Sequence, residues 1–319
     1  MNDLLHLGAD IGGTKTEAVL TAADGTVLAH RRVATPALDG PDAVLATVTE
    51  TLRRLRDRAG RAARIEGIGL GTHGIVSHPD GTVTHASQAL PGWTGTPLRR
   101  AVEDSLGLPV VVDNDVNTLA FAEMTLGAGA GHHNLLFVTV GTGIGGAVIT
   151  GGNLLRGSHG SGGELGHAPS AAAAGLPCSC GGTGHLDTVA SGTAIARAYH
   201  HSSGRPLDTR QIADLASAAD PHAQHVLAAA ASALGEAIGG LVSVLDPDLV
   251  VVAGGVASSG PCWWDPLRTA ARAATLPPLS GITITGPRLT HAAAARGAAA
   301  LAAHTFAPNR PQPQPCVTP

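Results

Sequence analysis

Residues 7–20 read Leu-Gly-Ala-Asp-Ile-Gly-Gly-Thr-Lys-Thr-Glu-Ala-Val-Leu, and residues 136–149 read Leu-Phe-Val-Thr-Val-Gly-Thr-Gly-Ile-Gly-Gly-Ala-Val-Ile. Each stretch has the pattern of a strand, a glycine turn and a second strand. Glycine leaves backbone N–H groups open to close approach by oxygens, which favours an anion site. Two such turns about 130 residues apart indicate that one nucleotide is held by its phosphates from both sides. The sequence therefore predicts a phosphotransferase.

The first turn carries the groups that phosphoryl transfer requires. Gly12, Gly13 and Thr14 offer N–H donors, and Asp10 at the strand end is placed to reach Mg²⁺ through a water. Lys15 is the only lysine among the 20 basic residues of the chain, which indicates a constraint at this turn. The alternative is a chance relic on an exposed turn. In the second turn, the matching residues that would bind the nucleotide are Gly141, Thr142 and Gly143.

A candidate general base follows the apolar run 108–112, in the segment Asp113-Asn-Asp-Val-Asn117. Transfer to a hydroxyl requires a carboxylate that accepts its proton. Open α/β sheets place their ligands just beyond the carboxyl ends of their strands, and both Asp113 and Asp115 meet that criterion. Asp115 is the preferred candidate. A turn or helix N-cap aspartate remains the alternative interpretation.

The segment 163–187 contains potential metal ligands. Cys178 and Cys180 form a Cys-x-Cys pair with His167 before it and His185 after it. These four soft or borderline ligands suffice for a closed tetrahedral zinc site. The alternative is two loop thiols and unrelated histidines. Cys262 and Cys316 are expected to be unpaired, inert thiols.

Length and composition fit a cytoplasmic protein with two domains of ordinary size. The chain has 319 residues, of which 44% are hydrophobic, and a net charge of −4. That charge gives no reason to expect nucleic acid or an anionic membrane as partner. Arginines cluster over 53–64, but a solvated helix face explains them. No basic leader precedes the first strand, and no apolar stretch is expected to approach the length of a membrane span.

Hydrophobic periodicity predicts alternating strands and helices. Gly254 and Gly255, after the buried strand 249–256, would admit an adenosine moiety, although close packing at a strand-to-helix turn explains them equally well. The segment 151–184 is expected to be irregular, and the tail 306–319 to be disordered. Strands are expected over 4–11, 16–22, 26–33, 65–70, 110–112 and at both sides of the 135–150 turn, which resembles a duplication of the N-terminal unit; helices are expected over 42–59, 116–127, 187–201, 208–217, 220–244 and 292–303.

Together these motifs resemble the ROK family of sugar kinases and sugar-responsive repressors, within the actin and hexokinase superfamily. The motifs over 10–15, 114–117, 141–146, 163–167 and 178–181 occur in the family's order, and the resemblance covers about residues 5–304. It implies two ribonuclease-H-like α/β domains closing over a cleft, with ATP and Mg²⁺ at the glycine turns. The expected domains are 1–117 with about 291–305, and 118–290.

The resemblance also implies roles for individual residues. Asp115 is implied to be the catalytic base, while Asn114, Glu164 and His167 are implied to contact sugar hydroxyls. His167 is implied to be shared between the sugar and a structural zinc ion. Homodimers are common in the family.

Several residues on the acceptor side depart from the family pattern. His185 stands where the family usually has cysteine, and a zinc site of His167, Cys178, Cys180 and His185 is still expected. Asp187 replaces the usual sugar-binding glutamate and is one methylene shorter, so its sugar contact is either lost or suited to a different ring. His73 replaces a usual proline, and the stretch 87–93 lacks a usual asparagine.

The sequence thus predicts an ATP-dependent, glucokinase-like hexose kinase. Because the departures lie on the acceptor side, a kinase of an N-acylated hexosamine or of a C7-type cyclitol is the alternative. A non-catalytic sugar sensor is a third hypothesis. The DNA-binding members of the family carry an extra N-terminal helix-turn-helix segment, for which the position of Asp10 leaves no room, and intact Asp115 and Lys15 favour catalysis.

Overall fold

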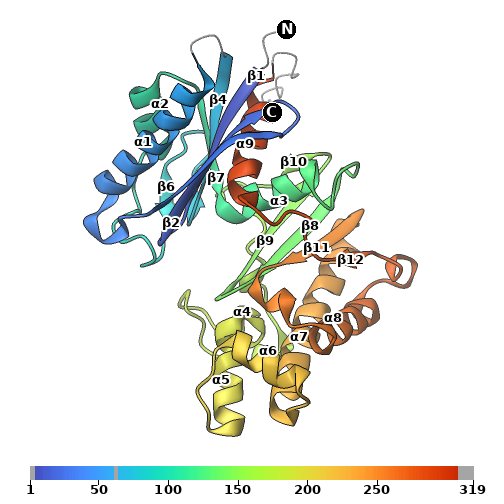
Figure 1. Ribbon diagram of the computed structural model, residues 1–319. Helices are drawn as coiled ribbons and strands as arrows, with labels where there is room; N and C mark the ends of the chain where they lie inside the picture. Colours follow the sequence, from blue (N-terminus) through green and yellow to red (C-terminus); the bar gives the residue numbers. More distant parts are fainter. Residues whose placement is uncertain (1–3, 61–63, 308–319) are drawn as a thin grey trace, which may run out of the picture. The chain divides into compact units, whose positions relative to one another are not determined.

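The computed structural model describes residues 4–60 and 64–307, and these form two compact units (Figure 1). The N-terminal unit comprises the described residues up to Thr125 together with those from His291 onward. The C-terminal unit comprises Leu126–Thr290. The tail expected to be disordered lies, after Ala307, outside the described residues, as does Cys316.

The N-terminal unit is built on a five-stranded mixed sheet in the order β3-β2-β1-β4-β7. β2 is antiparallel to β1 and β3, whereas β1, β4 and β7 are parallel. The strands expected over 65–70 and 110–112 are thus found as the parallel neighbours β4 and β7. The elements of this unit are β1 (Leu4–Ile11), β2 (Lys15–Ala22), β3 (Val27–Ala34), η1 (Ala37–Asp39), α1 (Pro41–Ala59), β4 (Arg64–Thr72), β5 (Ile75–Val76), β6 (Val83–His85), α2 (Leu98–Leu106), β7 (Val110–Asn114), α3 (Asp115–Leu126) and α9 (Ala293–Phe306).

Different residues of β1 face the two sides of this sheet, because side chains alternate along a strand. Leu5, Leu7 and Ile11 belong to a core that also contains the apolar residues of α1 and α2. Gly8 faces α9, where a Cβ would lie 2.1 Å from the Ala295 carbonyl oxygen. Small residues therefore let α9 pack directly on the backbone of the sheet.

The C-terminal unit repeats the same strand scheme in the order β10-β9-β8-β11-β12. β9 is antiparallel to β8 and β10, and β8, β11 and β12 are parallel. The resemblance between the two halves of the sequence is thus a structural duplication. The elements are β8 (Leu135–Val140), β9 (Ile144–Thr150), β10 (Asn153–Leu154), η2 (Leu165–His167), η3 (Ala171–Ala173), α4 (Asp187–Ala190), α5 (Gly192–Ser203), α6 (Thr209–Ser217), α7 (Pro221–Leu245), β11 (Leu249–Ala253), η4 (Gly255–Ser258), α8 (Pro261–Ala274), η5 (Pro277–Leu279) and β12 (Ile284–Thr285).

Helix α7 corrects the expectation that no apolar stretch approaches the length of a membrane span. Its 25 residues include a window of mean hydropathy 1.6, long and apolar enough to cross a membrane by length and composition. In the structure 56% of that window is buried, and Gly235 and Gly239 pack against the backbone of α8. These contacts are those of a core helix.

Other differences from the predicted elements have local causes. The helix expected over 187–201 is broken into α4 and α5 at Ser191, whose side chain accepts a hydrogen bond from Ala194 N–H and caps α5. The boundary between the units lies near the end of α3 instead of at 117/118, since Gly297 of α9 packs on the Thr118 backbone. Helix α2 was not predicted.

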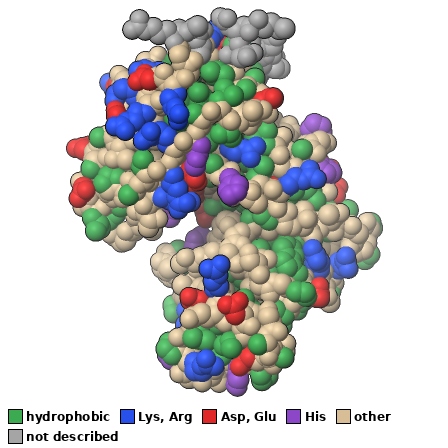
Figure 2. Space-filling view, viewed as in Figure 1, with side chains coloured by type: hydrophobic (Ala, Val, Ile, Leu, Met, Phe, Trp, Pro, Cys, Tyr) green, Lys and Arg blue, Asp and Glu red, His purple; other side chains and the backbone are tan. Residues whose placement is uncertain are grey.

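Figure 2 shows basic side chains gathered on the N-terminal unit. In α1, Glu50 accepts hydrogen bonds from Arg53 and Arg54 at 2.8 and 2.7 Å, and in α2 Arg99 pairs with Glu103. Exposed pairs of this kind contribute little to stability. They are the interactions of a solvated helix face.

Candidate functional site

The first glycine turn joins β1 to β2 and is tightly closed. Gly12 N–H donates to the Lys15 carbonyl at 3.0 Å. A Cβ on Gly13 would lie 2.3 Å from the carbonyl oxygen of Ala89, so the loop around Ala89 packs directly on this turn. Thr14 is exposed. The Lys15 ammonium lies 3.7 Å from the Glu17 carboxylate, and its side chain is 43% exposed.

The strand register brings three ionisable side chains to one edge of the N-terminal sheet. Asp10 of β1 pairs with Gly71 of β4, and Thr72 at the end of β4 pairs with Asn114 at the end of β7. The next residues, His73 and Asp115, therefore leave neighbouring strands at the same carboxyl edge. Asp10, His73 and Asp115 thus come from three adjacent strands, with His73 on the middle one.

Both carboxylates at this edge have raised pKa values. Burial, followed by repulsion from Asp115, raises the pKa of Asp10 to about 7, although Lys15 acts in the opposite direction. Burial also raises the pKa of Asp115, while His73 and the N–H group of Val116 lower it. Two partly desolvated carboxylates side by side form a site for a cation or for a proton from substrate.

The structure separates the two candidates for the general base, Asp113 and Asp115. Their positions after the strand did not distinguish them. Asp113 is 1% exposed; its Oδ1 accepts hydrogen bonds from Asn114 N–H at 2.9 Å and Asn117 Nδ2 at 2.7 Å. His78 Nε2 lies 3.6 Å from Asp113 Oδ2. The carboxylate of Asp113 therefore stabilises the start of α3 through these contacts. Asp115 is the first residue of that helix.

Asn114 is held by backbone groups on both sides of its amide. Its Nδ2 donates to the Gly74 carbonyl at 2.9 Å, and its Oδ1 accepts from Val116 N–H at 2.8 Å. Oδ1 also accepts from Asn117 N–H at 3.4 Å, so these bonds use one of the two hydrogens of Nδ2 and both lone pairs of Oδ1. A sugar contact by Asn114 would therefore use the second hydrogen of Nδ2.

The second glycine turn, between β8 and β9, is held by a side chain. Asp187 Oδ1 accepts a hydrogen bond from Ile144 N–H at 2.7 Å, and it is also the nearest atom to a Cβ placed on Gly143, at 3.1 Å. The start of α5 closes the other side, where Gly192 N–H donates to the Gly141 carbonyl at 2.9 Å. The structure thus places Asp187 at the phosphate turn, a contact that sequence reasoning missed.

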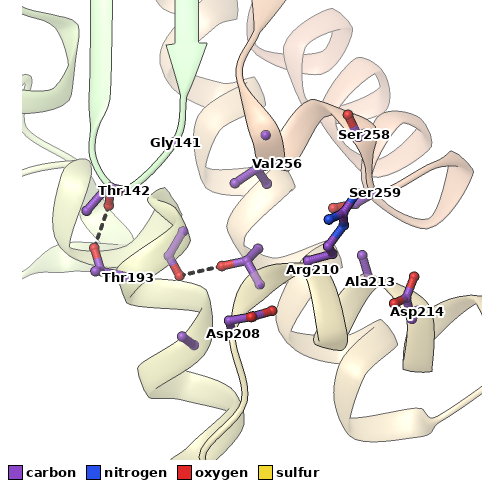
Figure 3. A pocket seen from close by; sticks show the side chains of 14 residues that line it. Gly141, Thr142, Thr193, Asp208, Arg210, Ala213, Asp214, Val256, Ser258 and Ser259 are labelled. Carbon is purple, nitrogen blue, oxygen red and sulfur yellow. Dashed lines mark hydrogen bonds between the residues drawn. The ribbon is translucent and has the colours of Figure 1, made fainter. Parts of the chain in front are cut away.

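Next to this turn the C-terminal unit contains a cavity of about 730 Å³ (Figure 3). Thr142 and Thr193 face each other at one end, where Thr193 Oγ1 donates to the Thr142 carbonyl at 2.5 Å. The wall of the cavity includes Arg210 and Asp214 of α6. The 14 lining residues are Gly141, Thr142, Gly192, Thr193, Ala196, Asp208, Thr209, Arg210, Ala213, Asp214, Gly255, Val256, Ser258 and Ser259.

Only some of these lining residues were foreseen. Gly141, Thr142 and Gly255 were predicted to bind the nucleotide, whereas those from α5 and α6 were missed. The Asp208-x-x-Gln211 pattern is a sequence signal for the start of α6, since Asp208 caps this helix in a capping box. It carries no information about the cavity.

The two glycines that follow β11, Gly254 and Gly255, have different roles. Gly254 has φ +98°, and a Cβ there would lie 2.3 Å from the Val140 carbonyl oxygen. Close packing of β11 against β8 therefore requires Gly254. Gly255 has open space around it and lines the cavity.

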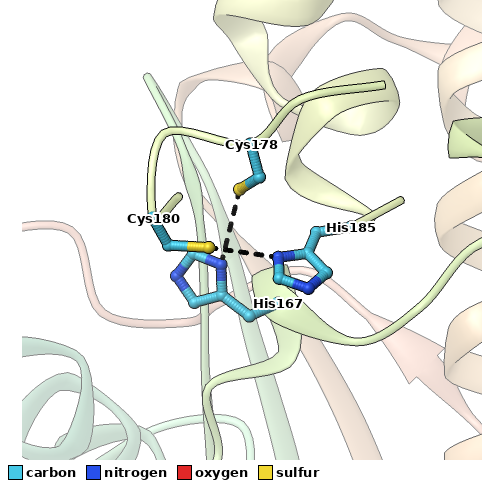
Figure 4. Close-up of side chains that lie close together, drawn as sticks. All are labelled: His167, Cys178, Cys180 and His185. Atoms are coloured by element: carbon cyan, nitrogen blue, oxygen red, sulfur yellow. Dashed lines mark hydrogen bonds between the residues drawn. The ribbon is translucent and has the colours of Figure 1, made fainter. Parts of the chain in front are cut away.

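The four predicted metal ligands come together in one cluster (Figure 4). Cys178 Sγ lies 3.7 Å from His167 Nδ1, and Cys180 Sγ lies 3.2 Å from His185 Nδ1. All four ligand atoms lie within 4.8 Å of one another. Tetrahedral zinc, with bonds of about 2.0–2.3 Å, needs ligand atoms roughly 3.5 Å apart. The donor set and its spacing fit that ion.

Tight turns shape this loop around the cluster. Cys178 N–H donates to the Gly182 carbonyl at 2.8 Å, and Gly181 N–H donates back to Cys178 at 3.0 Å. His167 lies in η2, which begins just after Glu164; both side chains are exposed. Nδ1 of His167 faces Cys178, and its Nε2 has no hydrogen-bond partner among the described residues 4–60 and 64–307.

Comparison with known proteins gives consistent matches over nearly the whole chain. The model of the ROK family matches residues 6–305. A glucokinase from Halalkalibacterium halodurans is 35% identical over 292 residues, covering 87% of this chain and 88% of that protein. The crystal structure of a ROK hexokinase from Thermus thermophilus has a TM-score of 0.84 at 38% identity, covering 93% of this chain and 97% of that one.

A ROK family glucokinase from Streptomyces griseus, solved with glucose and AMPPNP, has a TM-score of 0.75 at 31% identity. The match covers 93% of this chain and 98% of that one. These structural similarities confirm the predicted actin/hexokinase-like α/β fold.

Proposed function

The chain belongs to the ROK family, and from this membership we propose that it phosphorylates a hexose with ATP, with Asp115 as the general base. The carrying observation is the position of Asp115 at the carboxyl end of β7, on the same edge of the sheet as Asp10 of β1, with β4 between the two strands. Its raised pKa makes its carboxylate a stronger proton acceptor than an exposed aspartate. Asp115 would take the proton of the attacking hydroxyl as the phosphoryl group is transferred.

The nucleotide side of the proposal rests on both glycine turns. Gly12, Gly13 and Thr14 in one unit, and Gly141 to Gly143 in the other, would offer N–H groups to the phosphates. The cavity beside the second turn, at about 730 Å³, has the size of a small-molecule site and would hold the adenosine moiety against Gly255. The solved relative with AMPPNP supports the use of ATP.

Mg²⁺ is proposed to lie near Asp10, reached through a water, where it would neutralise the phosphate charge. Repulsion from Asp115 raises the cost of ionising Asp10, and a divalent cation between the phosphates and Asp10 would offset it. Lys15, close to Asp10, adds a second positive charge at this turn.

On the acceptor side we propose glucose or a close analogue, contacted by Asn114, Glu164 and His167. The glucokinase relatives support this choice. A sugar contact by Asp187 stays a prediction that competes with its hydrogen bond to Ile144. N-acylated hexosamines and C7-type cyclitols remain the alternative acceptors.

Zinc is proposed as a structural ion held by His167, Cys178, Cys180 and His185. The four donors fit tetrahedral zinc, and the ion would fix the ring of His167 while leaving Nε2 to the sugar. Protein purified without chelators should therefore contain about one zinc per chain. Absence of zinc from such protein would remove this part of the proposal.

The experiment that tests the proposed function measures ADP release with ATP over a panel of hexoses, N-acylated hexosamines and cyclitols. Glucose should stimulate release, and Asp115→Asn should lower kcat by about 10²–10⁴-fold with the sugar still binding. Greatest stimulation by an N-acylated hexosamine or a cyclitol would select the alternative acceptor. If sugar binds but no acceptor stimulates ADP release above Asp115→Asn, the chain is a sensor and the kinase proposal fails.

A homodimer and a cytoplasmic location also stay predictions. The C-terminal end of α7 exposes Val244 at 78%, and apolar residues of the same helix line a neighbouring groove, which supports association through this unit. The molar mass of the purified chain, measured by light scattering, would decide between monomer and dimer.

A further inference from the structure

Residues next to two of the predicted zinc ligands meet at Ile144, the first residue of β9, directly after the second glycine turn. Gly166, which precedes His167, packs on the Ile144 carbonyl, because a Cβ on Gly166 would lie 2.3 Å from that oxygen. Asp187, two residues after His185, accepts a hydrogen bond from Ile144 N–H at 2.7 Å. Both backbone groups of Ile144 are therefore contacted by segments that carry predicted zinc ligands.

The two segments come from different stretches of the chain and meet at the cluster of predicted zinc ligands (Figure 4). His167 belongs to η2, whereas the other three ligands lie in the loop before α4. The backbones of the two segments also pair, since Leu186 N–H donates to the Ala168 carbonyl at 2.9 Å. A zinc ion bound to ligands from both segments would add a second link close to the groups that hold Ile144.

The short helix α4 extends this contact to the start of the glycine turn. Asp187 begins α4, and its carbonyl accepts a hydrogen bond from Ser191 Oγ at 2.6 Å. Ser191 caps α5, and the next residue, Gly192, donates its N–H to the Gly141 carbonyl at 2.9 Å. Gly141 and Gly192 both line the cavity beside the turn. The segment from Asp187 to Gly192 therefore holds both ends of the second turn.

We propose that Asp187 is a positioning residue that couples the zinc site to the nucleotide site: when the cluster binds zinc, Asp187 holds Ile144 and the N–H groups of the second turn in the conformation that binds phosphate. The proposal rests on the proposed zinc ligands and on the proposed binding of nucleotide at this turn, and it extends both. It gives the metal a role on the phosphate-donor side, in addition to its proposed effect on His167 at the acceptor side.

Coupling between two binding sites is reciprocal, so each ligand must strengthen binding of the other by the same factor. The link through Asp187 is one hydrogen bond from a backbone N–H group to a carboxylate, and loss of such a bond costs roughly three- to tenfold in binding. Zinc should therefore strengthen nucleotide binding about three- to tenfold, and nucleotide should strengthen zinc binding equally.

The test measures the Kd of a non-hydrolysable ATP analogue by titration calorimetry, with Mg²⁺ held constant and no sugar present, so that the acceptor side does not contribute. Zinc-loaded full-length protein is compared with protein depleted by a zinc-selective chelator. In wild type, depletion should raise the Kd about three- to tenfold. Asp187→Ala should already bind the analogue weakly when loaded with zinc, and depletion should raise its Kd less than about twofold.

Two matched variants separate positioning by Asp187 from a general loss of structure. Asp187→Asn keeps a side-chain oxygen that can accept from Ile144 N–H, so it should keep most of the zinc dependence. Thr193→Val removes the hydrogen bond from Thr193 Oγ1 to the Thr142 carbonyl and leaves Asp187 in place. This variant should bind the analogue more weakly, with the zinc dependence of wild type.

The reciprocal measurement starts from folded, zinc-loaded protein, so it does not depend on the stability of the depleted form. Competition with a colorimetric chelator gives the zinc affinity with and without the ATP analogue. The analogue should strengthen zinc binding about three- to tenfold in wild type and less than about twofold in Asp187→Ala.

The inference is overturned if zinc depletion leaves the Kd of wild type unchanged, or changes the Kd of wild type and of Asp187→Ala by the same factor. It is also overturned if the purified chain binds no zinc. Failure of the proposed function looks different, because no acceptor would then stimulate ADP release. Failure of the inference leaves nucleotide binding and ADP release intact and removes only their dependence on zinc.

Discussion

The two glycine turns occupy equivalent places in duplicated sheets but are fixed by different means. The first turn is surrounded by charge, with Asp10 before it, Lys15 and Glu17 after it, and the Ala89 backbone pressed on Gly13. The second turn follows the apolar strand β8 and is held by one carboxylate, Asp187, and by the start of α5. The same backbone motif can thus be held by close packing against another loop, or by several long-range hydrogen bonds.

This contrast implies a division of labour. The first turn keeps desolvated carboxylates close to the reacting groups, at a cost in folding stability. The second turn presents N–H groups next to a cavity that is lined mainly by uncharged residues, and it needs only to keep its conformation. Substitutions of the buried groups at the first turn should therefore affect stability, and substitutions at the second turn should affect nucleotide affinity.

The largest effect is expected at Asp10, whose pKa is raised from 3.8 to about 7. A carboxyl group with a higher pKa in the folded state binds more protons there, so it lowers stability as pH rises from about 4 to about 7. Asp10→Asn removes this cost. Without nucleotide or Mg²⁺, the variant should become more stable than wild type by a few kcal/mol at pH ~8, and by much less at pH ~4.5.

Chemical denaturation of both proteins at the two pH values measures this difference, and kinase activity measures its counterpart. Activity of Asp10→Asn should fall although its stability rises. A stability difference independent of pH would contradict the assignment of buried charge to the first turn.

A pair of matched glycine substitutions gives the next largest effect. Gly13→Ala forces the Ala89 backbone to move and should lower the free energy of unfolding by about 1–3 kcal/mol. A Cβ on Gly141 would meet open space, with no atom beyond its chain neighbours within 4 Å in the described part of the chain. Gly141→Ala should therefore leave thermal stability nearly unchanged. It should instead raise the KM for ATP, because the added methyl group blocks approach of phosphate oxygens.

The comparison would fail if Gly141→Ala lost as much stability as Gly13→Ala. The comparison would also fail if Gly13→Ala left both the melting temperature and the activity at wild-type values. The loop around Ala89 would then move aside for the added methyl group at no measurable cost.

Asp187 tests the second turn directly. Asp187→Ala leaves Ile144 N–H without its acceptor at 2.7 Å, which should weaken ATP binding by about 1–2 kcal/mol, or roughly 5- to 30-fold in KM. Asp187→Asn keeps a side-chain oxygen and should lose less. A rise in the KM of the sugar, with the KM of ATP unchanged, would instead assign Asp187 to the acceptor site.

Periodicity and glycine placement were sufficient to predict most strands and helices of this fold. β1, β2 and β4 follow alternating or continuous apolar runs, and the duplicated turn indicated a duplicated sheet. Helix α2 was missed although Leu98, Val102 and Leu106 recur at helical spacing, because nine residues without a side-chain cap give a weak signal. The break at Ser191 was missed because the cap lies inside an apparently continuous helix.

The site was predictable where chemistry is local in the chain. The Cys-x-Cys pair and its histidines lie within about 20 residues, and the structure brings them together. Asp187 and Ile144 are 43 residues apart, and Asp10, His73 and Asp115 come to one edge only because three strand ends meet there. No local pattern encodes such contacts, since they arise only when the sheet is assembled.

The smallest effect is expected at Lys15, where the comparison between the turns is sharpened most. Its ion pair with Glu17 is 3.7 Å long and its side chain is 43% exposed, so Lys15→Gln should change stability by no more than about 0.5 kcal/mol. If its role is to neutralise phosphate, kcat/KM for ATP should still fall about tenfold or more, because that charge acts only on the nucleotide. Glu17→Gln is the matched control: it breaks the same ion pair, leaves Lys15 in place and should retain activity. Equal kinetics for Lys15→Gln and wild type would make Lys15 a surface residue and leave the first turn with its backbone N–H groups alone.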